Sequence, residues 1–423
     1  GSPSSRVVRS HEPIRRRGAI PPRKSSGPLV RIGNTPLKQA VLFIYFPSIL
    51  MSLGQGMLIP ALPVLGETFG VSGAFAVQAL TAQLLGRGIT LIPAGGAIDR
   101  WGAKPVMIGG AALATLSGVA AATAPNFFVI LAAQFTWGAG TSIWMFGREI
   151  AAFDMVKADQ RGRQMSALMG IGSTGMAFGP AVGGVLTDII GIRALFWVYS
   201  GASALVLGIS MVQHHAKSTH ERKQGPLFNF GAIKQINPYF KVTYLVLFIA
   251  TFSQMARGQV TNSALPLYTQ ETLGYSATTT GLIFTVMGLT TFLMIVPTGF
   301  ISDKLGRKWA ATPAAVFSLV GFLLLPLFSS VPSLMFVAFV IGIANGLAMG
   351  AMTIYTFDIV PEEFKGQLQA LRRSLGELGA VMSPPVVGIL AVTFSPSAPF
   401  WFFAPLHAIS ALLLIFVAKE SLR

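Results

Sequence analysis

The chain of 423 residues is 52% hydrophobic and only 11% charged, whereas soluble domains carry roughly a quarter charged residues. This composition argues against a soluble globular protein. Basic residues outnumber acidic ones 31 to 15, which gives a formal net charge of +16. In a soluble protein this charge would favour a nucleic-acid partner, but here the basic residues flank apolar segments, which indicates a lipid bilayer instead. Cysteine is absent, so disulfides and thiolate metal sites are excluded.

Twelve stretches are long and apolar enough to cross a membrane, since a hydrocarbon core of roughly 30 Å requires about 20 residues of helix. We therefore predict an all-α integral membrane protein with twelve transmembrane helices. Glycine and proline inside these stretches are typical of membrane helices. The predicted spans are 41–64, 76–98, 105–124, 127–152, 164–187, 194–213, 243–267, 278–302, 309–329, 333–356, 367–391 and 399–418.

Basic residues in the connections fall almost entirely on one side of the predicted membrane, and Arg193 alone lies on the other. The positive-inside rule then predicts a multi-pass protein of the plasma (inner) membrane with both termini in the cytoplasm. The first 40 residues predict a disordered tail that contacts anionic headgroups; an organellar transit peptide is the alternative. The predicted domains are the tail (1–40), an N-terminal six-helix bundle (41–213), a cytoplasmic loop (214–242), a C-terminal six-helix bundle (243–418) and a cytoplasmic C-terminus (419–423).

The chain contains an internal repeat with one constant offset of 204 residues, because Asp99 recurs as Asp303 and many other positions recur with it. The repeat runs without a gap from the first span to the fifth, which predicts two equivalent halves. Two parallel halves fit a secondary transporter that binds its substrate between them and works by alternating access. The repeated pairs include Pro93/Pro297, Gly95/Gly299, Gly102/Gly306, Lys104/Lys308, Asp154/Asp358, Gly175/Gly379, Pro180/Pro384, Gly184/Gly388, Gln55/Gln259 and Glu67/Glu271.

The loop after the second span, Gly95-Gly-Ala-Ile-Asp-Arg-Trp-Gly-Ala-Lys104, and its copy over 299–308 resemble the loop signature of the major facilitator superfamily. The resemblance covers about residues 40–420 and implies a pair of six-helix bundles with a cytoplasmic latch that holds the outward-facing state. Glycines permit a tight turn and close helix approach, and the acid can pair with basic residues. The predicted latch comprises Gly95, Asp99, Arg100, Gly102, Lys104, Asp154, Gly299, Asp303, Gly306, Arg307, Lys308 and Asp358.

A glycine-rich stretch in the fifth span, formed by Gly175, Gly179, Pro180, Gly183 and Gly184, resembles the signature of the twelve-helix drug:proton antiporters. Its small residues allow close helix packing and its proline bends the helix; the resemblance implies a bias toward export. A packing helix that is merely rich in glycine and proline is the alternative.

Two departures from the family pattern bear on coupling. Gln134 stands where the family places an Arg thought to serve proton transfer, and the first span offers Gln55 where some exporters of cationic drugs have an acid. These departures weigh against proton coupling and against a preference for cations.

Ionisable residues inside the spans are costly and therefore indicate function. For the substrate cavity we predict Arg87, Arg257, Gln55, Gln259 and Asn262, and for proton coupling Glu377 first and Glu149 second, with Arg373 and Arg148 beside them. The alternative is structural: Arg373 and Glu377 lie on one helix face and can neutralise each other. Likewise, Arg148, Glu149 and Arg372 lie near the cytoplasmic face, where the arginines can extend toward water.

The residues together predict a proton-coupled exporter of small amphipathic compounds, acting as a monomer without a cofactor or metal. The alternative is a transporter of an organic anion or lysolipid that uses the buried arginines as counter-ions without proton coupling. A membrane-embedded enzyme would require clustered acids or histidines, so we predict that the chain is not an enzyme. The sequence has no phosphate-binding loop for ATP. We expect Asp188 to face water and His407 to be a packed side chain.

Overall fold

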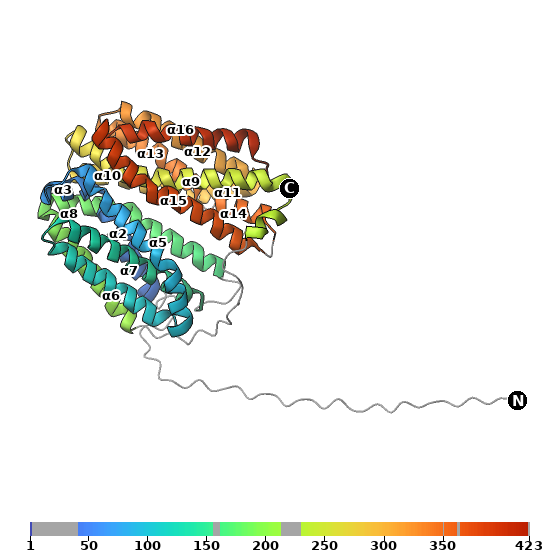
Figure 1. Cartoon of the computed structure of the whole chain (residues 1–423), viewed down its shortest axis with the longest axis horizontal. Helices are drawn as coiled ribbons and strands as arrows, with labels where there is room; N and C mark the ends of the chain where they lie inside the picture. Colours follow the sequence, from blue (N-terminus) through green and yellow to red (C-terminus); the bar gives the residue numbers. More distant parts are fainter. Residues whose placement is uncertain (2–40, 155–160, 213–229, 350, 362–363, 422–423) are drawn as a thin grey trace.

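The computed structural model describes residues 1, 41–154, 161–212, 230–349, 351–361 and 364–421. All secondary structure in these residues is helical, and Figure 1 shows two bundles packed side by side, the first coloured blue to green and the second yellow to red. Most of the predicted tail (2–40) and much of the predicted central loop (213–229) lie outside the described residues.

The first bundle begins with a span broken into short pieces around its prolines and ends with a 52-residue helix, α8. Inside α8 the backbone at Gly191 leaves the helical region (φ 82°, ψ 167°), so α8 contains two spans that join at one glycine. This break falls where the sequence predicts the end of the fifth span. The elements are η1 (Val41–Tyr45), α2 (Phe46–Met57), η2 (Ile59–Ala61), α3 (Leu62–Thr68), α4 (Gly73–Ala76), α5 (Gln78–Trp101), α6 (Ala103–Ala122), α7 (Phe127–Asp154) and α8 (Arg161–Val212).

The second bundle starts earlier than predicted, because its first long helix begins at Pro238 rather than at residue 243. The Asn237 side chain accepts a hydrogen bond from Tyr239 N at 3.0 Å, and Pro238 fits the first turn, which together start a helix. The elements are η4 (Phe230–Gln235), α9 (Pro238–Leu267), η5 (Tyr268–Thr272), α10 (Ala277–Leu293), α11 (Ile295–Lys304), α12 (Arg307–Leu324), η6 (Leu325–Leu327), α13 (Val331–Ala348), α14 (Ala351–Ile359), α15 (Lys365–Thr393), α16 (Ala398–Leu412) and η8 (Leu413–Val417).

The described residues contain ten helical segments that are long and apolar enough to cross a membrane. One of them, Gly170–Val212, contains the break at Gly191 and counts as two spans. A further span is α5, which lies outside the ten and carries Arg87 and Arg100. The predicted fold of twelve transmembrane helices in two bundles is therefore confirmed.

The repeat is visible in the backbone. Gly70 and Gly274 have φ values of 65° and 72°, and Gly102 and Gly306 have 85° and 117°, so equivalent turns lie 204 residues apart. We call the side of the molecule with the turns at Gly102 and Gly306 the latch side. The side with the turns at Gly70 and Gly274 is the far side.

Two seams join the bundles toward the far side. In the α8–α10 seam, a Cβ at Gly184 would overlap the Ala277 carbonyl oxygen, and a Cβ at Gly281 would overlap that of Pro180. In the α4–α15 seam, a Cβ at Gly388 would lie 2.7 Å from the Ala74 carbonyl oxygen. Only glycine permits backbones to approach this closely, so the seams close the far side at the level of the main chain.

Polar contacts across the halves strengthen this closure. Asp188 Oδ2 accepts a hydrogen bond from Thr278 N at 2.8 Å, at the beginning of α10, and Gln270 Nε2 donates to the Pro60 carbonyl at 2.7 Å. The expectation that Asp188 simply faces water is therefore incomplete: its side chain is exposed but binds the N-terminus of a helix in the other half, where a negative charge is favourable.

Candidate functional site

A cavity of about 680 Å³ lies between the two bundles. It is lined by parts of α2, α7 and α8 from the first bundle and of α9, α10, α13, α14 and α15 from the second. Glu149, Thr353 and Arg373 line it where α7 ends and α14 and α15 approach the latch side. Because the seams close the far side, the cavity extends from the middle of the molecule toward the latch side.

Two smaller cavities share lining residues with this central cavity. One of about 260 Å³ is lined by Arg87, Arg257, Gln259 and Glu377, and one of about 80 Å³ is lined by Gln55, Arg87, Gln259 and Asn262. All five residues predicted to contact substrate thus line cavities between the halves, although they come from α2, α5 and α9. Their role in binding stays a prediction.

Arg257 is an isolated charge in the interior of α9. It is only 3% exposed, its Nη1 donates to Ser318 Oγ of α12, and its Nε has no hydrogen-bond partner in the part of the chain that the structure describes. Within the described part of the chain, no carboxylate oxygen lies within 4.0 Å of Arg257 or Arg87. Near it, His407 is packed as expected, with its Nδ1 2.6 Å from Ser253 Oγ.

The predicted partners of the two acids are present but distant. Arg148 Nη2 lies 3.7 Å from Glu149 Oε1, and Arg373 Nε lies 3.9 Å from Glu377 Oε1. The Arg373 side chain is 62% exposed, and an ion pair of this length and exposure contributes little free energy. Glu377 is therefore only loosely tied to its neighbour.

Two arginines lie deeper than expected. The structural alternative for Arg148 and Arg372 was a position at the membrane interface or a pairing between helices; each is 3% exposed, so neither extends toward water. Arg148 lies over the Trp144 ring at 5.6 Å from its centroid, and Arg372 donates to Thr251 Oγ1 and to Gln369 Oε1. These contacts hold both guanidinium groups inside, where they line the central cavity.

The second copy of the latch forms a network of ion pairs. Arg307 Nη1 donates to Asp303 Oδ1 at 2.6 Å, and Arg307 Nε donates to Asp358 Oδ2 at 2.9 Å. The Glu420 carboxylate accepts from the backbone of Arg307 and Lys308 at 3.0 and 3.1 Å, so it caps the beginning of α12. Sequence reasoning missed Glu420 because it lies 113 residues from Arg307 in the chain.

The first copy of the latch is described in part. The side chains of Asp99 and Asp154 lie outside the described residues, and Arg100 is exposed. A Cβ at Gly95 would meet only Phe146 at 3.7 Å, and one at Gly299 would meet nothing within 4 Å. Gly95 therefore has an ordinary side-chain contact with α7, and among the described residues neither glycine makes the close helix approach that was predicted for it.

The glycine-rich stretch of α8 packs against two helices at once. A Cβ at Gly175, Gly179 or Gly183 would run into Ile49, Leu53 or Met57 of α2, whereas Gly184 and Pro180 face α10. The stretch therefore connects the first span of its own half with the other half. Its bias of transport toward export stays a prediction.

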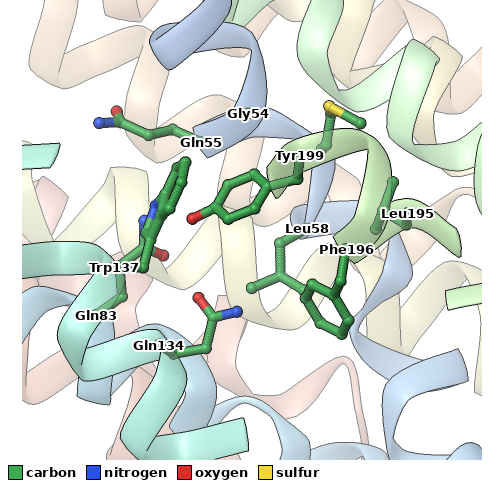
Figure 2. Close-up of a pocket in the computed structure, with 10 residues that line it drawn as sticks. Gly54, Gln55, Leu58, Gln83, Gln134, Trp137, Leu195, Phe196 and Tyr199 are labelled. Atoms are coloured by element: carbon green, nitrogen blue, oxygen red, sulfur yellow. The ribbon is translucent and has the colours of Figure 1, made fainter. Parts of the chain in front are cut away.

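Gln134 lines a small pocket of about 10 Å³ inside the first bundle, which is about the size that holds one water molecule. Figure 2 shows Trp137 and Tyr199 side by side next to Gln134, with Gln83 and Gln55 nearby. The lining of this pocket is mostly apolar, its polar side chains are Gln55, Gln83, Gln134 and Tyr199, and no charged residue is among the lining residues.

Comparison with known sequences identifies the family. The sequence model of the Major Facilitator Superfamily matches residues 44–256 and 244–423. A class C tetracycline resistance protein of Escherichia coli is 26% identical over 371 residues, covering 86% of this chain and 91% of the relative. The quinolone resistance protein NorA of Staphylococcus aureus is 23% identical over 362 residues, covering 84% and 90%.

Solved structures show the same fold. A D-xylose–proton symporter aligns with a TM-score of 0.72 and 16% identity, covering 92% of this chain and 99% of that one. A POT family transporter in complex with 5-aminolevulinic acid aligns with a TM-score of 0.74 and 12% identity, covering 91% and 96%. The predicted resemblance is confirmed: the chain belongs to the Major Facilitator Superfamily and is a multi-pass membrane transporter, not an enzyme.

Proposed function

We propose that this protein exports small amphipathic compounds in exchange for protons by alternating access. The observation that carries the proposal is the central cavity of about 680 Å³, which is mostly apolar in its methionines, alanines and Phe284 but holds charged residues at one end. Such a lining suits compounds that are apolar with a few polar groups. The similarity to tetracycline and quinolone resistance proteins supports a drug-like substrate.

The conformation supports a transport cycle in which the far side opens when the latch side closes. If the latch side is cytoplasmic, as the distribution of basic residues predicts, the cavity takes up substrate from the cytoplasm. The seams then separate on the far side as the latch-side ends of the helices converge, which is the rocking motion expected of two repeated halves. The export direction rests on the glycine-rich stretch of α8.

Glu377 is the proposed proton carrier, with Glu149 as the second candidate. Glu377 lines the cavity of about 260 Å³ between the halves, and its only ion pair among the described residues is the long contact with Arg373. A carboxylate in this position can release a proton when the cavity faces one side and regain it when the cavity faces the other. Gln134 has no role in this proposed proton pathway, because its side chain carries no charge.

The second candidate function is transport of an organic anion or lysolipid without proton coupling. The observation that favours it is the charge of the lining, since Arg87, Arg257 and Arg373 face one acid, Glu377, in the cavity of about 260 Å³. Both candidates use the same cavity, but only the first requires a titrating carboxylate.

The test uses purified protein in liposomes that enclose a pH-sensitive dye, with an imposed proton gradient. Lipophilic cations, neutral drugs and organic anions are added in turn, and we expect proton movement that depends on the added compound. Transport without proton movement would favour the second candidate, and absence of transport for every class would refute both.

Variants assign the proton carrier in the same assay. Glu377→Gln should abolish proton movement, while Glu67→Gln, which makes the same chemical change at an exposed acid on the far side, should retain it. If Glu377→Gln keeps the wild-type pH profile, Glu149→Gln decides whether the second acid carries the proton.

A further inference from the structure

The cavity of about 260 Å³ contains more positive than negative charge. Arg87 of α5, Arg257 of α9 and Arg373 of α15 line it together with a single acid, Glu377. That acid contacts Arg373, at 3.9 Å. Arg87 and Arg257 are thus left without a carboxylate partner among the described residues.

One hydrogen-bond donor of the Arg257 guanidinium group has no acceptor among the described residues. Its Nη1 donates to Ser318 Oγ, and Ser318 Oγ in turn donates to the Ala314 carbonyl at 2.6 Å. Its Nε is buried and finds no acceptor among the described residues. A buried guanidinium group without a counter-ion or a full set of acceptors is costly, so the site has unused capacity for a negatively charged acceptor.

The other residues that line this cavity indicate what kind of molecule would carry the negatively charged group. Leu84, Met255, Met349 and Ala380 contribute apolar surface to the same cavity. Its volume exceeds what a bare inorganic anion fills, and a planar guanidinium group matches the two oxygens of a carboxylate. These features fit an organic carboxylate with an apolar body.

We propose that Arg257 and Arg87 form a subsite for the carboxylate of the transported compound, an inference that rests on the proposed transport function. Arg87 belongs to the first half and Arg257 to the second. A carboxylate bound by both therefore links the halves at the cavity. Because this contact is made only when the two arginines are close together, substrate favours the conformations that bring the halves together there.

The test compares 4-tert-butylbenzoate with 4-tert-butylbenzamide, which have the same shape and differ in charge. Binding to the purified full-length protein in lipid nanodiscs is measured by isothermal titration calorimetry. We expect the carboxylate to bind at least tenfold more tightly than the amide, and Arg257→Gln to remove this difference. Arg257→Lys, which keeps the charge but loses the planar group, should retain part of it. Arg87→Gln should reduce it.

Lys234→Gln is the matched control, because it removes the same charge from an exposed residue before α9. It should bind both compounds as the wild type does. Arg257→Gln should fold, since Ser318 keeps its bond to Ala314 and a buried uncompensated charge is lost. Thermal unfolding of the variant checks this directly.

Three outcomes would overturn the subsite: equal affinity for the acid and the amide, an acid preference that survives Arg257→Gln, or displacement of the benzoate by chloride or phosphate at equal concentration, which would assign the site to inorganic anions. The liposome assay keeps this result separate from the proposed function. Proton-coupled transport of neutral drugs with no preference for the acid would refute only the subsite, whereas acid binding without any transport would refute only the transport proposal.

Discussion

The α8–α10 seam and the α4–α15 seam occupy equivalent places in the two repeats but differ in how they are packed. In the first, Gly184, Gly281 and Gly288 each meet the main chain of the facing helix. In the second, Gly388 meets the Ala74 carbonyl oxygen at 2.7 Å and the end of the Gln78 side chain at 3.2 Å. A Cβ at Gly184 would lie within 3.0 Å of three main-chain atoms, whereas one at Gly388 would lie within 3.0 Å of a single main-chain atom, and its next neighbour is the end of a glutamine side chain, which can rotate. The first seam is therefore the stiffer of the two.

The largest effect is expected from Gly281→Val, which places a branched side chain against the Pro180 carbonyl. Overpacking of this kind costs about 1–3 kcal/mol, which corresponds to a shift of roughly 5-fold to 150-fold in the ratio of closed to open far sides. Spin labels attached at Thr68→Cys and Thr272→Cys, one in each half, report the distance between the halves on the far side by double electron–electron resonance. The chain contains no cysteine, so no other position is labelled.

Gly201→Val is the control for this variant, because a Cβ at Gly201 meets nothing within 4 Å. The distance between its two spin labels should equal that in the labelled protein without a glycine substitution. If Gly281→Val also leaves the distance unchanged, the α8–α10 seam does not hold the far side closed.

A matched pair compares the seams directly. Gly184→Ala and Gly388→Ala add the same methyl group at positions 204 residues apart. We expect Gly184→Ala to slow transport more strongly, since its Cβ would lie within 3.0 Å of three main-chain atoms of Ala277 and Thr278, whereas a Cβ at Gly388 would lie within 3.0 Å of one, the Ala74 carbonyl oxygen. Transport rates in liposomes measure the difference, and equal losses would show that both seams are equally stiff.

A smaller effect is expected from Asp188→Asn, which removes the charge that binds Thr278 N at 2.8 Å across the α8–α10 seam. The asparagine amide oxygen can still accept the hydrogen bond from Thr278 N, so only the charge is lost. A negative charge at a helix N-terminus stabilises by about 0.3–1 kcal/mol. The label distance should show a modest increase in the open population. The effect should shrink at high salt, and an effect independent of salt would contradict the electrostatic explanation.

The smallest effect is expected from Gly299→Ala on the latch side. The added methyl group enters open space, and alanine favours a helix by up to about 1 kcal/mol over glycine. Thermal unfolding in this conformation should therefore be unchanged or slightly later. A clear loss of stability would mean that a neighbour contacts Gly299 in the dominant conformation.

Hydropathy and the repeat were sufficient to predict the fold, because each span has to be apolar over its whole length and each repeated glycine performs the same local task in both halves. The predicted cavity residues were found by a similar argument: polar side chains at mid-membrane depth are costly unless they face a cavity. In the structure Arg87, Arg257 and Gln259 line a cavity, and their contact with substrate stays a prediction.

The features that the sequence did not predict depend on how the helices are arranged in space. The bond between Asp188 and α10 and the Glu420 cap on α12 join residues far apart in the chain, and neither has a local sequence signal. The burial of Arg148 and Arg372 did not follow from the sequence, because residue count along a helix gives height in the membrane but not the direction of the side chain. Trp144 and Thr251 set that direction.

The break at Gly191 also affects how far the far side can open. A connection of a single residue contains no slack, so the two spans of α8 cannot separate at that end and must travel as a hinged pair. Any force that pulls the first of them away from α10 is passed to the second, which packs against α6. Lengthening this connection with a few flexible residues would let the first span move alone, and would thereby uncouple the seam from the body of its own bundle.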